Sequence, residues 1–148
     1  MVILKLQPEQ ISRHWDVLRE VLTTLVMDGE QLEQKQVTKI AEKLISEQVQ
    51  CWAVQEQVEN EYNLVGFVFT SIVVDAIMEI KNLLLLGLYT LRPPSGLFIW
   101  TKSFEKLLLY ARGNGCKSII FYTNVPVLLS MAKKFGANVE YTYGVIPT

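Results

Sequence analysis

The sequence predicts one domain, residues 1–148, of the α/β class in its broad sense, which includes α+β arrangements. The stretch from Tyr89 to Gly136 carries most of this prediction, because it reads as strand, sharp turn, helix, strand and helix. A strand-helix-strand unit of this length requires two parallel strands joined by a right-handed crossover. Half of the residues are hydrophobic, which is enough to fill one core in a chain of 148 residues.

The helix of this unit is predicted between about residues 97 and 112, where apolar residues recur at helical spacing with charged residues largely between them. Asn114-Gly115 then ends the helix, because glycine readily adopts the left-handed conformation found at helix ends. Ser118 to Tyr122 is short, apolar and rich in β-forming residues, and Pro126 suits the first turn of a last helix. The apolar positions of the central helix are Trp100, Phe104, Leu107, Leu108 and Ala111.

The first part of the chain predicts a strand and two helices. Val2 to Leu6 reads as a short strand, and Pro8 opens a helix in its first turn. Met27 to Gly29 ends that helix, and Asp28 is the candidate N-cap of the next one, with Gln31 reaching back to it. The two apolar stripes are Ile11, Trp15, Leu18, Leu22 and Leu25, and then Val37, Ile40, Ala41, Leu44 and Ile45.

Three further strands are predicted between these helices and the central unit. They cover Gln50 to Gln57, Leu64 to Val74 and Ile77 to Leu91. Gly87 interrupts the last of them, and an isolated glycine in a strand marks a bulge, a close backbone approach or a packing position. After Gly136 the chain has room for one more strand, Val139 to Val145, and a tail, unless Gly144 turns a minimal hairpin.

The formal net charge of -1 gives no reason to expect nucleic acid or an anionic membrane as a partner. Residues 92–136 nevertheless carry seven basic side chains against one acid, Glu105. A basic half suits an anionic ligand, and solvated helix faces account for the same charges. No apolar stretch reaches the roughly 18 residues of a membrane helix, and we expect no leader before the first strand. We therefore expect a cytoplasmic protein or part of a soluble assembly.

The cysteines and the histidine predict no metal site. Cys51 and Cys116 lie in apolar, strand-like surroundings without CxxC or other metal spacing, so we expect both thiols to be small core residues. His14 is the single histidine, and a structural zinc site has too few ligands to form.

The run from Ala111 to Thr142 reads ARGNGCKSIIFYTNVPVLLSMAKKFGANVEYT. It resembles the pattern AREKGCKKIYLETN-x-PAAxxLYEKLGFKVEYT of the GNAT superfamily of N-acetyltransferases. Asn124, the turn from Lys134 to Gly136 and the spacing between them match, and the order of elements is similar over nearly the whole chain. The resemblance implies a mixed, mainly antiparallel central sheet with helices on both faces and a parallel pair of fourth and fifth strands. It also implies acetyl-CoA as the cofactor.

The resemblance places the cofactor pyrophosphate on a glycine-rich loop at a helix N-terminus. Aligned backwards from Gly115, the chain keeps Gly96 but has Phe98 and Trp100 where the family has small residues. Two lost charge-assisted hydrogen bonds, at about 1.5–3 kcal/mol each, make acetyl-CoA binding weak or absent. A register shifted by one residue, with Arg92 as the basic residue, is the alternative. The residues that a working site would use are Tyr89, Leu91, Ser95, Gly96, Phe98, Trp100 and Asn124.

The catalytic groups that the resemblance implies are not found at the matching positions. The fourth strand carries no acid between residues 82 and 89, and the nearest one, Glu79, reads as a solvated strand residue. The family's tyrosine acid falls on Ala132 here. Catalytic residues therefore stay unassigned.

An eroded cofactor site on a preserved scaffold favours a non-catalytic structural or interaction protein, similar to short phage-encoded GNAT-like proteins, which would fit a virion component. The alternative is a divergent acetyl-CoA-dependent N-acetyltransferase that acts on an unknown amine. The family closes its sheet with a final strand beside the fifth, and this chain is short there. We therefore expect a protein partner, or a second copy, at the C-terminal sheet edge. No nucleic acid or membrane partner is expected.

Overall fold

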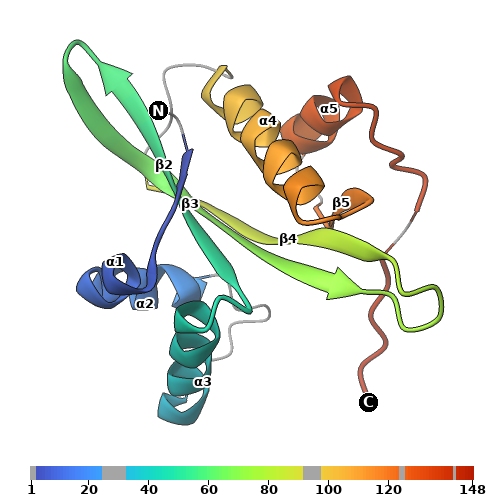
Figure 1. Cartoon of the computed structure of the whole chain (residues 1–148), viewed down its shortest axis with the longest axis horizontal. Helices are drawn as coiled ribbons and strands as arrows, with labels where there is room; N and C mark the ends of the chain where they lie inside the picture. Colours follow the sequence, from blue (N-terminus) through green and yellow to red (C-terminus); the bar gives the residue numbers. More distant parts are fainter. Residues whose placement is uncertain (1–2, 25–32, 92–97, 124–125, 142) are drawn as a thin grey trace.

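The computed structural model describes residues 3–24, 33–91, 98–123, 126–141 and 143–148. In these residues five strands form one sheet in the order β1-β2-β3-β4-β5 (Figure 1). Strands β4 and β5 are parallel and the other neighbours are antiparallel, as predicted. The strands are β1 (Ile3–Lys5), β2 (Gln50–Val58), β3 (Glu61–Val74), β4 (Lys81–Thr90) and β5 (Ser118–Phe121).

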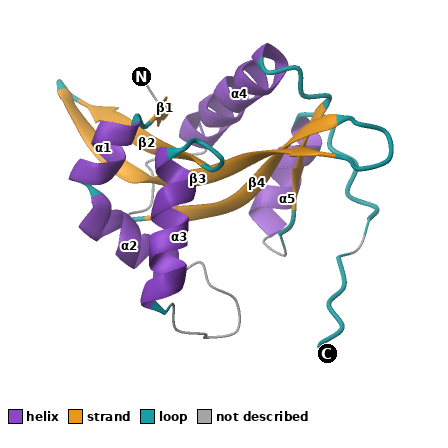
Figure 2. Ribbon diagram, turned by 60° about the horizontal axis from the view of Figure 1, so that its bottom comes forward, coloured by secondary structure: helices purple, strands orange, loops and turns teal. Residues whose placement is uncertain are grey.

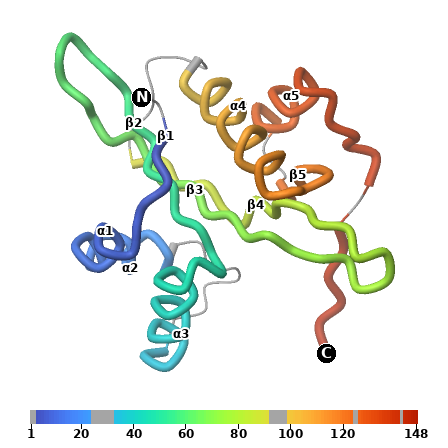
Figure 3. The backbone as a smooth tube through the Cα atoms, in the orientation of Figure 1, coloured from blue at the N-terminus to red at the C-terminus, as the bar shows by residue number. Residues whose placement is uncertain are grey.

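Helices cover both faces of the sheet, which confirms the predicted layers (Figures 1 and 3). On one face α4 and α5 pack over a core that contains Trp52 and Val54 of β2. On the other face α1, α2 and α3 pack over Cys51 and Ala53 of the same strand, because successive side chains of a strand point to opposite faces. The helices are α1 (Pro8–Arg13), α2 (Trp15–Thr24), α3 (Gln34–Ile45), α4 (Phe98–Gly113) and α5 (Pro126–Lys134).

The first predicted helix is in fact two helices, α1 and α2, separated at His14. His14 leaves the helical conformation at φ -106° and ψ 18°, while its amide still donates to the Gln10 carbonyl. Both Ile11 and Leu18 are buried on either side of this break, so the apolar stripe continues although the helix does not. The spacing of apolar residues in the sequence reports only which side chains are buried. A buried apolar stripe does not require one continuous helix.

Helix α3 has a capping box at its N-terminus. Glu33 is the N-cap of α3, and its backbone amide donates a hydrogen bond to Oε1 of Gln36 in a capping box. The predicted pair Asp28 and Gln31 lies outside the described residues.

Of the three alternatives for Gly87, the structure shows a bulge beside this residue. Phe69 of β3 lies opposite Gly87, whereas the next residue, Thr70, lies opposite Leu85. Leu86 is therefore the extra residue of β4. The strand itself begins at Lys81 rather than at the predicted Ile77. The reason is that the Asp75 carboxylate accepts the amides of Ile77 and Met78, at 2.9 and 2.7 Å, and holds residues 75–80 in a turn.

The ends of the central helices follow the sequence prediction. Gly115 has φ 73°, and the amides of Gly115 and Cys116 donate to the Arg112 and Ala111 carbonyls at 3.1 and 2.9 Å. This is a Schellman motif, in which the left-handed residue lets the last turn satisfy its carbonyl groups. Pro126 opens α5 as expected.

The predicted strand from Val139 to Val145 is wrong. Residues 137–141 and 143–148, the described part of what we call the C-terminal tail, form no regular structure, and Figure 2 draws them as loop. The apolar and polar residues do alternate here, but a strand also needs a hydrogen-bonded neighbour. In the described sheet β5 is the last strand and has no further strand beside it.

Candidate functional site

Strand β5 ends before β4 does, so the parallel pairing covers only the first part of β4. Their pairing runs from Asn82 opposite Ser118 to Leu85 opposite Phe121, and there it stops. From Leu86 to Thr90, β4 continues with β3 on one side and no described strand on the other. We call this stretch of β4 the opening. The bulge at Leu86, whose extra residue bends the strand and increases its twist, lies where the opening begins.

Gly66 brings β3 and β4 unusually close at this opening. A Cβ atom on Gly66 would lie 2.0 Å from the carbonyl oxygen of Tyr89, so only glycine fits. The half-buried Tyr89 packs against the core under α1, α2 and α3, on the face opposite α4. Sequence reasoning missed Gly66, although an isolated glycine inside an apolar strand is the signal that could have identified it.

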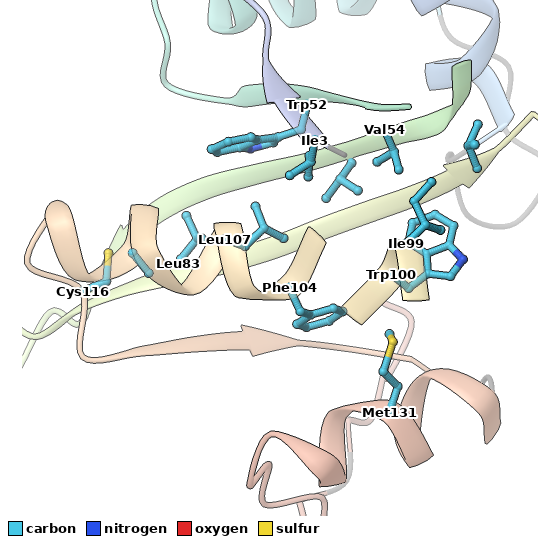
Figure 4. Close-up of a cluster of buried hydrophobic side chains, with 13 residues drawn as sticks. Ile3, Trp52, Val54, Leu83, Ile99, Trp100, Phe104, Leu107, Cys116 and Met131 are labelled. Carbon is cyan, nitrogen blue, oxygen red and sulfur yellow. The ribbon is translucent and has the colours of Figure 1, made fainter. Parts of the chain in front are cut away.

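Trp100 lies in the core rather than on the surface. Its side chain is 8% exposed and belongs to the apolar cluster between α4 and the sheet, together with Phe104 and Met131. Figure 4 shows Trp100 and Ile99 at one end of α4, with Met131 of α5 on the same side of the cluster. The first turn of α4 is therefore used for packing.

Of the other predicted cofactor residues, the structure describes Leu91 and Phe98. Leu91 is exposed just after β4, and its amide donates to the Val65 carbonyl at 2.7 Å. Phe98 is the first residue of α4. Ser95, Gly96 and Asn124 lie outside the described residues.

Neither Glu79 nor His14, the acid and the histidine singled out in the sequence, lies at the opening. Glu79 is exposed in the turn before β4, and its φ of 55° is left-handed. That turn precedes the paired end of β4, whereas the opening follows it. His14 is exposed between α1 and α2. In the described ranges no group of three or more His, Cys, Asp or Glu residues could hold a metal ion.

Tyr110 lies in the last turns of α4, away from the first turn. Its ring and the Trp52 ring pack edge to face at a centroid distance of 4.9 Å, and Nζ of Lys5 lies 5.8 Å from the centre of the Tyr110 ring. Burial raises the pKa of the Tyr110 hydroxyl, while the positive charge of Lys5 acts in the opposite direction. These contacts make Tyr110 a partly buried packing residue.

A groove of about 860 Å³ follows the outer edge of β5, and we call it the β5 groove. Strand residues 117–123 form one wall, and side chains of α4, α5 and the C-terminal tail form the others. Tyr143 of the tail contacts Tyr122 at a ring-centroid distance of 4.4 Å. The remaining lining is mostly apolar and includes Phe104, Leu108, Leu129, Phe135, Val139 and Tyr141.

A second hollow, of about 460 Å³, lies between α2, α3 and the strands β3 and β4. Leu84 and Leu86 of β4 form part of its wall, so it reaches β4 next to the opening. Ser71, one of its polar residues, donates its hydroxyl to the Gln48 carbonyl at 2.8 Å. Across the described helices, none combines the length and the apolar character that crossing a bilayer demands.

No protein-family model matches the chain, and no curated protein matches its sequence. Solved structures do match. A probable acetyltransferase superposes with a TM-score of 0.72 at 14% identity, over 100% of this chain and 98% of that one. Ribosomal-protein-alanine N-acetyltransferase from Brucella melitensis biovar Abortus 2308 gives 0.66 at 14% identity, over all of both chains. The chain has an acetyltransferase fold.

A predicted acetyltransferase from Clostridium acetobutylicum, solved with acetyl-CoA, superposes with a TM-score of 0.68 at 13% identity, over 97% of this chain and 94% of that one. The GNAT-like fold inferred from residues 111–142 is thereby confirmed. At such identities the likeness is one of fold, and the chemistry has to be argued from the residues of this chain.

Proposed function

We propose that this chain is a GNAT-like protein with an eroded acetyl-CoA site, of the kind seen in short phage-encoded proteins, and that it works by associating with another protein chain. The observation that carries the proposal is the outer edge of β5. This edge ends the described sheet, faces an apolar groove and is not covered by the described tail residues as a strand. An uncovered edge is a template for a further strand.

The residues in the first turn of α4 support the view that acetyl-CoA binds weakly or not at all. Phosphates bind at helix N-termini when backbone amides can approach them, which requires small residues nearby. Trp100 occupies one of the positions that the family keeps small, and its side chain is buried in the core. The packing of α4 against the core therefore uses an aromatic ring at a position where phosphate binding needs a small residue.

The absence of acid on β4 supports the same view. Deprotonation of an acceptor amine needs a base within hydrogen-bond reach, directly or through one water molecule. Residues 82–89 carry no carboxylate, and Glu79 lies in the turn at the other end of β4. Acetyl transfer would have to use a base from elsewhere in the chain.

The second candidate is a divergent N-acetyltransferase. The opening beyond Leu85 and Phe121, the bulge at Leu86 and the edge of β4 that has no described strand beside it favour it. In the GNAT superfamily the pantetheine arm of the cofactor uses such a strand edge. One of the structures that this chain resembles holds acetyl-CoA.

Calorimetric titration with acetyl-CoA separates the two candidates. We expect no measurable heat, or a dissociation constant in the millimolar range. The Clostridium acetobutylicum protein, titrated under the same conditions, is the positive control. A dissociation constant of a few micromolar for this chain would overturn the proposed function and leave the acetyltransferase as the better candidate.

A further inference from the structure

We propose that the outer edge of β5 pairs with the β5 edge of a second copy of this chain, in antiparallel register centred on Ile120. The two sheets would then continue across a two-fold axis. This inference rests on the proposed function and names the partner that the edge takes.

The edge carries few of the features that prevent strands from pairing. Natural edge strands are protected by charges, proline or bulges. β5 has the sequence Ser-Ile-Ile-Phe, its ladder with β4 is regular, and Lys117 at its start is the nearest charge. In the described part of the molecule no strand covers its outer side.

The sequence of the edge is complementary to itself. An antiparallel pair centred on Ile120 places Ile119 opposite Phe121, Ser118 opposite Tyr122, and Lys117 opposite Thr123. No two like charges then face each other, and the apolar residues meet apolar residues. The two residues of each such pair lie an even number of positions apart in the strand. The N–H and C=O groups of both residues therefore point to the same side of their strand. About four to six main-chain hydrogen bonds can therefore form.

Apolar side chains remain exposed around this edge. Tyr122 is 61% exposed and Tyr143 57%, although the two rings touch, and Phe135 borders the β5 groove beside them. A two-fold axis at Ile120 brings the same surface of both copies together, as an isologous interface requires. The paired segment is short, so we expect a weak dimer with a dissociation constant in the micromolar range.

Ile120 offers a test of the register itself. Ile119 packs against the core under α4, so Ile120 projects to the other face, where it is partly exposed and can be replaced. In the proposed dimer each Ile120 lies opposite its own copy. Ile120→Lys and Ile120→Glu each place like charges face to face, whereas a mixture of the two variants places opposite charges there. Ile120→Thr is the neutral control.

Sedimentation velocity from low to several hundred micromolar should show a concentration-dependent dimer for the unchanged chain and for Ile120→Thr. Each charged variant should be monomeric alone, and the mixture should dimerise again. A monomeric unchanged chain overturns the dimer but leaves the proposed function, which acetyl-CoA titration tests separately. A dimer that both charged variants retain contradicts the register.

Hydrogen exchange of the unchanged chain gives a readout without substitutions. Amides of residues 118–122 that point away from β4 should gain protection as the protein concentration rises. Protection that is already complete at low concentration would show that the chain covers its own edge. That result would also overturn the inference.

Discussion

The indole N–H of Trp52 donates to the hydroxyl of Thr70 at 2.9 Å, from β2 to β3 inside the core. Thr70 donates in turn to Oε1 of Gln50 at 2.9 Å, and the Gln50 amide donates to the Glu47 carbonyl at 2.8 Å. The Thr70 side chain is completely buried. The chain of bonds therefore satisfies three buried polar groups and ties the turn after α3 to the sheet.

Thr70→Val should destabilise the protein strongly because it removes the hydroxyl and keeps the shape. The Trp52 N–H and the Gln50 oxygen then lose their partner, at a cost of about 1–3 kcal/mol for each group. Thr70→Ser, which keeps the hydroxyl and loses only a methyl group, should cost about 1 kcal/mol. Urea unfolding of the two variants measures the difference. Equal losses would mean that the hydrogen bonds contribute little.

Two glycines at the end of α4 should respond to alanine with opposite signs. Gly115 has φ 73°, so Gly115→Ala should cost about 1–2 kcal/mol, the strain of a left-handed residue with a side chain. Gly113 is the last helical residue, and Gly113→Ala should stabilise by about 0.5–1 kcal/mol. A Cβ meets no atom within 4 Å at either position, so packing does not interfere. Thermal unfolding would contradict this view if both variants shifted in one direction.

Cys51 should make stability fall at high pH. Burial raises the pKa of its thiol from 9.0 to about 12. The folded state holds this proton more tightly than the unfolded state does. The thiol's contribution to the free energy of unfolding is therefore complete below pH 9. It is lost as pH rises towards 12, at about 1.4 kcal/mol per pH unit. The unfolding free energies of the unchanged chain and of Cys51→Ala, which has no thiol to titrate, should therefore converge by about 2 kcal/mol between about pH 8 and about pH 10.5. A constant difference over that range would exclude a buried, neutral thiol.

The sequence predicts the elements of the central unit well because each one has a local cause. Gly115 ends α4 through its own conformation, Pro126 starts α5, and Gly87 marks the bulge of β4. The failures have causes that are not local. Whether Val139 to Val145 forms a strand depends on a neighbour to pair with, and the break at His14 depends on how two helices fit one sheet.

The candidate site was predictable only in part, for a related reason. The resemblance assigned Trp100 to the cofactor loop, but only the packing of α4 against the sheet shows that its ring is buried in the core. The role of Gly66 depends on how closely β3 approaches Tyr89, a distance that no sequence pattern reports.

The last prediction concerns Trp100, which should limit cofactor binding while it stabilises the core. Trp100→Ala should cost about 3–5 kcal/mol, because it deletes a buried aromatic side chain. If the ring also keeps phosphates away from the first turn of α4, the variant should bind acetyl-CoA at least about tenfold more tightly than the unchanged chain, the value of one regained charge-assisted hydrogen bond. Calorimetry with acetyl-CoA measures the affinity, and urea unfolding measures the stability.

Phe104→Ala is the matched control, since Phe104 belongs to the same cluster one turn further along α4. This variant should lose a similar amount of stability without any gain in affinity. A gain in both variants would reflect general loosening of the core. If Trp100→Ala binds acetyl-CoA no more tightly than the unchanged chain, another residue prevents phosphate binding. Phe98 and the prolines at 93 and 94 are then the next positions to change, because proline supplies no amide donor to a phosphate.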